Sequence, residues 1–158
     1  MRDQTARRAA VVEAVSSNTF CTLATSSADN RPHVAGVLYA LVGRDLYINT
    51  DVTSRKARNI GENQRVAVCI PVPVDTQAPP FTVSLQGTAT LLQNDDAEIV
   101  RLVADGSLAA ITSQGELERP GTCFVKVSPR RRAAVCGIGV SQEELDTDPF
   151  GAFHSVEW

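Results

Sequence analysis

One stretch of the sequence is the most informative about how the chain folds: Leu46-Tyr47-Ile48-Asn49-Thr50-Asp51-Val52-Thr53-Ser54-Arg55-Lys56-Ala57-Arg58-Asn59-Ile60. Its first part, Leu46–Asn49, is short and apolar, which predicts a strand. Its last part, Ser54–Ile60, predicts a short helix with Thr53 or Ser54 as the N-cap. The stretch therefore predicts a strand and a helix joined by a short loop, with the N-terminus of the helix at that loop.

The first turn of this helix carries two basic residues, Arg55 and Lys56. Free backbone N–H groups and the positive end of the helix dipole meet there, which makes the segment a candidate anion site. Basic residues in a first turn oppose the dipole, so helix stability does not explain them, whereas a bound anion would. The two cations and the helix end contribute roughly 4–7 kcal/mol, and micromolar binding requires about 8 kcal/mol. We therefore expect a phosphate attached to a flat apolar ring rather than a lone phosphate.

Apolar runs bounded by turn residues lie on both sides of this stretch and predict a β-sheet. One of them, His33–Leu41, leaves neither face of its strand polar. A strand buried on both sides needs a second cover beyond its own core, and a partner subunit or a bound ring would supply it. The other early strands are predicted over Phe20–Ala24, Leu46–Asn49, Arg65–Val72 and Phe81–Leu91.

Strict alternation marks the predicted strand over Phe81–Leu91. Apolar residues and glycine stand at its odd positions, and uncharged polar residues stand between them. This pattern predicts one apolar face and one face of hydroxyl and amide groups. The polar face either forms hydrogen bonds in a semi-buried surface or is solvated, because threonine also favours strands for steric reasons. Its members are Thr82, Ser84, Gln86, Thr88 and Thr90.

The beginning of the chain predicts a helix, and the last third predicts two more strands. The helix covers about residues 4–15, and the strands cover Thr122–Val127 and Ala133–Val140. Between the strands stands the run Pro129-Arg130-Arg131-Arg132. Three adjacent arginines suggest phosphate binding, and they also fit a solvated hairpin turn, which is the interpretation we favour.

Composition narrows the class of protein. A chain of 158 residues fits one domain, and 43% apolar residues is ordinary for a globular protein. A net charge of −3 argues against a nucleic-acid partner. No run reaches the ~18 apolar residues of a membrane span, and Glu13 interrupts a signal-like N-terminus, so we expect a cytoplasmic protein. The four cysteines form no C-x-x-C pair and predict small buried hydrophobes rather than a metal or redox site.

A family resemblance rests on several motifs in order. Leu46–Asn49 is followed by Ser54-Arg55-Lys56-Ala57, then by Arg65-Val66-Ala67-Val68 and by Val83-x-x-x-Gly87-x-Ala89. Together these residues, with the strand before them, resemble the pyridoxamine-phosphate-oxidase-like proteins over about residues 17–92. The resemblance implies a mainly β fold, a six-stranded antiparallel split β-barrel of Greek-key type with short flanking helices. It also implies a homodimer that binds flavin mononucleotide (FMN) in two clefts at the subunit interface.

The resemblance assigns cofactor-binding roles to particular residues. Arg55 and Lys56 match the phosphate-binding pair, and Ser54 matches the residue beside them. Thr82 falls near a position where the true oxidases place a glutamine that contacts the ring. The strand segment that lies along the cofactor, with its end, comprises Tyr47, Ile48, Asn49 and Thr50. The second-strand stretch that faces the isoalloxazine ring comprises Ala35, Gly36 and Val37.

Two departures narrow the expected activity. The true oxidases have a basic residue near the end of the second strand, where this chain reads Val37-Leu38-Tyr39. Their C-terminal Trp-x-x-Arg region is not recognisable in Phe153–Trp158. Pyridoxamine phosphate oxidation is therefore not expected, and the chain looks more like the flavin or deazaflavin oxidoreductase branch of the superfamily.

The expected function is an FMN-dependent oxidoreductase that passes hydride to or from a small-molecule substrate through the ring. No side chain is assigned a catalytic role, because no general base stands out. One alternative keeps the fold and replaces FMN with the deazaflavin coenzyme. Others are a non-catalytic module that binds a flavin or haem, with His33 and His154 as the only imidazoles, and an empty dimeric scaffold.

The tail of the domain, about residues 141–158, is unusually aromatic. Phe150, Phe153 and Trp158 follow a polar stretch, and large rings in such an arm require a surface to pack on. They pack either on their own barrel or on the other subunit. In the second case Trp158 would lie at the edge of the partner's cofactor cleft.

Overall fold

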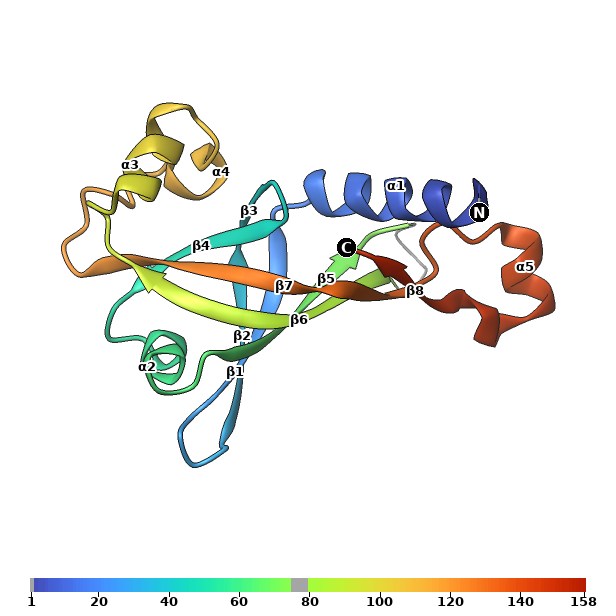
Figure 1. The fold of residues 1–158 in the computed structure, drawn as a ribbon, viewed down its shortest axis with the longest axis horizontal. Coiled ribbons are helices and arrows are strands. Elements are labelled where there is room, and N and C mark those ends of the chain that lie inside the picture. The colour runs from blue at the N-terminus through green and yellow to red at the C-terminus, as the bar shows by residue number, and fades with distance from the viewer. Residues whose placement is uncertain (1, 75–79) are drawn as a thin grey trace.

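A single curled antiparallel sheet dominates the computed structural model, which describes residues 2–74 and 80–158 (Figure 1). The strand order is β2-β1-β5-β6-β7-β4-β3, and β8 joins the side of β7. This mainly β, half-barrel architecture confirms the predicted split barrel, although the described residues form eight strands where six were expected. The strands are β1 (Phe20–Ser26), β2 (Pro32–Leu38), β3 (Ala40–Val42), β4 (Asp45–Asp51), β5 (Arg65–Val72), β6 (Phe81–Leu92), β7 (Thr122–Cys136) and β8 (Phe153–Glu157).

Short helices surround this sheet (Figure 1). Helix α1 lies along one side of the barrel and contacts β3, β5 and β8. Helix α2 packs against β1, β2 and β6, and α3 and α4 stand together at the end of the molecule opposite α5. The helices are α1 (Arg2–Ser16), α2 (Arg55–Glu62), α3 (Ala97–Ala104), α4 (Ala109–Thr112) and α5 (Gln142–Thr147), with a 3₁₀ turn over Pro149–Ala152.

The inward faces of the strands form the main core. Leu23, Ile48 and Leu85 are fully buried there, and Val11 and Val15 of α1 pack into the same cluster. Each such side chain stabilises the fold by roughly 1.5–3 kcal/mol relative to full exposure. A second, smaller cluster holds α3 and α4 on the other face of β4 and β7 through Tyr47, Ile99, Leu102, Leu108, Ile111 and Phe124.

Strand β6 shows the predicted period-two alternation. Val83, Leu85 and Ala89 are buried, whereas Gln86 and Thr88 are exposed on the opposite face. The outward-facing residues of β1, β5 and β7 continue the same surface on both sides of β6. We call this surface the outer face of the sheet.

The predicted hairpin turn at Pro129–Arg132 is wrong. Strand β7 runs without a break through this region, and its pairing with β6 shifts register between Leu85 and Gly87. Three arginines, Arg130–Arg132, therefore stand opposite one residue, Gln86, in a β-bulge. A proline followed by charged residues resembles a turn locally, but pairing along both flanks of β7 determines the structure.

The second strand also differs from its prediction. Val34 is 61% exposed and Leu38 is 51% exposed, because β2 is an edge strand and only β1 pairs with it among the described strands. The predicted run to Leu41 breaks at Tyr39, where the backbone N–H donates to the Thr19 carbonyl at 2.8 Å and the hydroxyl donates to the Val15 carbonyl. One face of β2 is thus uncovered in the single chain.

Replacing Gly87 with alanine should destabilise the protein by about 1–3 kcal/mol. A Cβ atom there would collide with the Ser128 carbonyl oxygen and lie 2.9 Å from the Pro129 Cα, and both are backbone atoms that cannot move cheaply. Gly61→Ala is the matched control, because nothing lies within 4 Å of its Cβ and helix α2 gains up to about 1 kcal/mol. Urea unfolding measures the free energy of unfolding of both variants. A Gly87→Ala variant with the same urea midpoint as the wild-type protein would contradict the bulge geometry.

Candidate functional site

The side chain of Ser54 caps the N-terminus of α2. Ser54 is in extended backbone, with φ −62° and ψ 151°, and its Oγ accepts from the Ala57 N–H at 3.3 Å. The Thr50 hydroxyl lies 3.2 Å from the same Oγ and ties the end of β4 to the helix. Of the two predicted N-caps, Ser54 is therefore the one used, whereas Thr53 donates its N–H and hydroxyl to Asp51.

Unpaired donors gather at this helix end. Among the described residues, the backbone N–H groups of Arg55 and Lys56 have no hydrogen-bond partner, and neither side chain forms an ion pair. The Arg55 side chain is exposed and that of Lys56 is half-buried. Hydrogen bonds from Thr53 lower the pKa of Asp51, and the Lys56 charge adds to this effect. The site is thus a set of free N–H groups and two cations with one ionised carboxylate beside them.

Strand β4 places its predicted residues on two sides. The Ile48 side chain is fully buried in the main core, and Tyr47 is buried in the smaller cluster, where its hydroxyl donates to Glu98. Burial, reinforced by the Glu98 hydrogen bond, raises the pKa of Tyr47 to about 12. The Asn49 Nδ2 is buried and has no acceptor among the described residues, so a polar donor near this strand end is unsatisfied.

The structure brings β2 to α2 but keeps Thr82 apart from it. Helix α2 packs against β2, which carries Ala35, Gly36 and Val37 at the open edge of the sheet. Thr82 lies on the outer face at the start of β6, whereas Gln64, just after α2, accepts from the Ala89 N–H near the other end of that strand. Seven residues of strand separate the two points by roughly 20 Å, so within one chain Thr82 is not part of the α2 site.

The structure places Trp158 in the core of its own barrel. Its side chain is only 4% exposed, and its indole N–H donates to the Arg44 carbonyl at 3.0 Å. Phe150 and Phe153, in contrast, are 84% and 67% exposed. Of the two arrangements predicted for the tail, Trp158 takes the one on its own barrel, where its ring has no free surface for a cofactor.

Trp158→Phe should lower stability by about 1–3 kcal/mol and leave flavin affinity unchanged. The substitution removes one buried hydrogen bond and part of a buried ring, and each loss costs about 1 kcal/mol or more. Urea unfolding and a flavin titration of the same preparation measure the two quantities. Weaker flavin binding at unchanged stability would contradict this placement and indicate that the indole of Trp158 contacts the cofactor.

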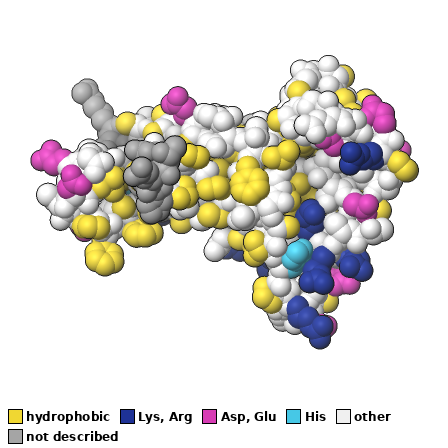
Figure 2. Space-filling model, turned by 180° about the vertical axis from the view of Figure 1, so that it is seen from behind, with side chains coloured by type: hydrophobic (Ala, Val, Ile, Leu, Met, Phe, Trp, Pro, Cys, Tyr) yellow, Lys and Arg dark blue, Asp and Glu magenta, His cyan; other side chains and the backbone are white. Residues whose placement is uncertain are grey.

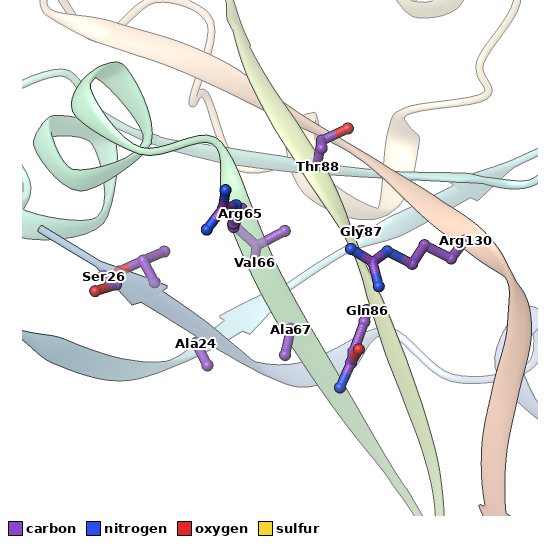
Figure 3. Close-up of a pocket in the computed structure, with 10 residues that line it drawn as sticks. Ala24, Ser26, Arg65, Val66, Ala67, Gln86, Gly87, Thr88 and Arg130 are labelled. Atoms are coloured by element: carbon purple, nitrogen blue, oxygen red, sulfur yellow. The ribbon is translucent and has the colours of Figure 1, made fainter. Parts of the chain in front are cut away.

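Sequence reasoning missed a groove on the outer face. Its volume is about 390 Å³, and it lies between β1, β5, β6 and the bulge of β7. Figure 3 shows Arg130 reaching from β7 over Gly87 toward the side of the groove where Arg65 stands. The sequence offered two separate signals, the polar face of β6 and the arginine run, and the pairing of β6 with β7 brings them to one face. We call this feature the outer groove.

Other site types are not found in the described residues. Within residues 2–74 and 80–158 no group of three or more His, Cys, Asp or Glu side chains is placed to hold a metal, and no helix is long and apolar enough to cross a membrane. All four cysteines are free. Burial raises the pKa of the Cys21 thiol to about 12, which makes it a poor nucleophile.

Basic side chains mark the part of the surface near α2. Figure 2 shows Lys and Arg side chains gathered around the projecting β1–β2 hairpin, on the side of the molecule where α2 lies. Hydrophobic side chains are scattered over the rest of this view. The sheet, the helix N-terminus and this basic region together define a split-barrel protein with a candidate anion site.

Comparison with known proteins identifies the family. The family model for pyridoxamine 5'-phosphate oxidase matches residues 8–136, and the chain belongs to this family. A search among curated proteins finds no significant match.

Solved structures of similar fold share little sequence with this chain. The haem storage protein HutZ from Vibrio cholerae has a TM-score of 0.71 at 19% identity, covering 82% of this chain and 94% of that one. A haem-binding protein from Mycobacterium smegmatis has a TM-score of 0.72 at 18% identity, covering 99% of this chain, which spans 58% of that one. An F420 reductase has a TM-score of 0.53 at 18% identity, covering 75% and 91%. At these identities the likeness concerns the fold alone.

Proposed function

We propose that this chain is an FMN-dependent oxidoreductase that acts on a small molecule as a homodimer. The observation that carries the proposal is the N-terminus of α2, where free N–H groups and two cations have no bound anion among the described residues. The FMN phosphate would be held there by Arg55, Lys56 and the N–H groups beside Ser54. Family membership supports this choice of ligand.

The ring of the cofactor would lie along the open side of the barrel. The uncovered edge of β2 at Ala35–Val37 adjoins α2 and offers backbone groups and a partly apolar surface. The unsatisfied Asn49 amide at the end of β4 is a donor that a polar ligand would complete. Tyr47, Ile48 and Thr50 would hold this strand end in place through their buried side chains.

The protein's role in this proposal is to bind, orient and exclude water. When bound, the flavin supplies hydride transfer through its ring. Arg55 and Lys56 would anchor the phosphate, and the edge of β2 would fix the ring. No side chain of the described region is assigned a proton-transfer role.

A homodimer would cover the outer face, including Thr82, and close the cofactor cleft. Small uncharged residues such as Thr22, Cys69, Ser84 and Ala134 form the middle of this face and allow close approach of a second sheet. Exposed apolar side chains flank it, among them Phe20 and Phe153. Because Thr82 is far from α2 in its own chain, it would meet the cofactor of the partner subunit.

The absorption spectrum of the purified, untagged protein tests the cofactor. A band at roughly 450 nm indicates flavin, and one at roughly 420 nm indicates the deazaflavin coenzyme, the alternative that the similar fold of an F420 reductase supports. Mass spectrometry of the heat-released supernatant identifies the molecule. Failure to bind added FMN would contradict the proposal.

A haem-binding module is the second candidate, in view of the two haem proteins of similar fold. The observation that favours it is His154, whose Nε2 is buried and has no hydrogen-bond partner among the described residues. Such an imidazole nitrogen is a potential iron ligand. A Soret band on haem titration, lost in His154→Ala, would support this function over the flavin one.

A further inference from the structure

The outer groove brings two arginines together without a counter-charge. Arg65 stands at the start of β5 and Arg130 in the bulge of β7, and both line the groove. Within the described part of the chain neither guanidinium has an ion pair or hydrogen bond, whereas the adjacent Arg131 is paired with Glu157 at 2.7 Å. The two side chains thus add two uncompensated positive charges to the lining of one groove, and an anion bound there would offset their repulsion.

Arg130 stands on the same side of β7 as Ser128 and Ala134, which pair with the outer-face residues Thr88 and Ser84. The two extra residues of the bulge keep this alternation and lengthen β7 opposite Gln86, so one short stretch carries three arginines. The close approach of the two strands at this point requires Gly87, beside Ser128 and Pro129. Bulges of this kind are frequent near binding sites.

The surrounding strands offer no carboxylate. Strands β1, β2, β5, β6 and β7 contain no Asp or Glu, although the chain as a whole carries a net charge of −3. Two carboxylates lie nearby: Glu157 of β8 is paired with Arg131, and Glu62 of α2 lines a neighbouring hollow together with Arg65. Neither forms an ion pair with Arg65 or Arg130 among the described residues, so an anionic small molecule can supply the counter-charge.

We propose that the outer groove binds a small molecule through its phosphate or carboxylate group. Arg65 and Arg130 would grip the anion, while Ser26, Gln86 and Thr88 supply hydrogen bonds at the rim. Ala24, Ala67 and Gly87 offer an uncharged surface on which a flat ring can lie. A volume of about 390 Å³ suits a small aromatic acid or phosphate ester.

This site is separate from the proposed phosphate site of FMN. Arg55 and Lys56 stand at the N-terminus of α2, whereas Arg65 follows its C-terminus. Eight helical residues separate the two ends by about 12 Å. The outer groove therefore carries a proposal that does not depend on flavin binding.

Titrations of the ¹⁵N-labelled full chain with phosphate, acetate and benzoate test the outer groove, with chloride at matched ionic strength as the baseline. We expect saturable shifts of the Gln86 side-chain amide and the Thr88 amide at millimolar concentrations. Arg65→Gln and Arg130→Gln should each weaken binding about tenfold or more. Arg131→Gln removes the same charge from the same bulge and should change binding less than about twofold.

The outcomes separate the alternatives. Phosphate binding tighter than benzoate indicates a phosphate ester as the ligand, and benzoate binding tighter than acetate and phosphate indicates an aromatic acid. Absent shifts at Gln86 and Thr88 with all three probes, or equal losses in Arg131→Gln and Arg130→Gln, would overturn the proposal. Shifts of the Arg55 and Lys56 amides report the FMN phosphate site in the same spectra, so failure of either proposal is visible independently.

Discussion

Arg55→Ala combined with Lys56→Ala should weaken FMN binding by about a hundredfold or more without unfolding the protein. Each cation contributes a charge-assisted hydrogen bond of ~1.5–3 kcal/mol to the phosphate, so removing both costs roughly 3–6 kcal/mol of binding free energy. The fold should persist because Arg55 is exposed, Lys56 is only half-buried, and neither forms an ion pair among the described residues. Quenching of flavin fluorescence during a titration measures the affinity.

A matched control is available at the other end of the molecule. Arg101→Ala with Arg119→Ala removes two positive charges from exposed positions around α3 and α4 and should leave FMN affinity within about threefold. An affinity loss of less than tenfold in the Arg55 and Lys56 double variant would show that the phosphate binds elsewhere. A loss equal to that of the control would show a general effect of net charge.

Ala134→Arg should convert a dimer of twice 16.9 kDa into a monomer of 16.9 kDa. Ala134 is exposed on the outer face, between Ser84 and Ser155 on the neighbouring strands, so an arginine there is solvated in the single chain. In a dimer packed through this face the same side chain would be buried without a carboxylate partner. Breaking an interface in this way costs several kcal/mol.

Light scattering at micromolar concentration measures the mass of both forms. Val100→Arg is the control, because Val100 is exposed on α3, away from the outer face. It should leave the dimer intact. A wild-type chain that is monomeric under these conditions, or an Ala134→Arg chain that remains dimeric, would contradict the proposed interface and the role of Thr82 with it.

Local patterns predicted the parts of the fold that depend on neighbouring residues. The alternation of β6 appears as predicted, since side chains on a strand point to opposite faces whatever else the sheet does. Ser54 caps α2 because an N-cap needs only its own side chain and the next turn. The central strands of the site and the start of α2 were therefore accessible from local patterns, whereas the split-barrel class followed from the family resemblance.

Features set by distant pairing were not accessible in the same way. The arginine run looks like a turn, and only pairing with β6 over both of its flanks makes it a bulge. The exposure of Val34 depends on the position of β2 at the sheet edge, which its apolar sequence does not reveal. Trp158 is buried because β8 joins β7, a contact between segments that the sequence does not mark as partners.

The open edge of β2 has a consequence for handling the protein. Its outer backbone groups have no partner strand among the described strands, and Val34 and Leu38 stand exposed beside them. Such an edge is a template on which strands of other molecules add, and only Pro32 at its start limits that addition. When no ligand or partner covers this edge, the protein should therefore aggregate through β-strand addition before it unfolds. The loss of soluble protein should rise steeply with protein concentration.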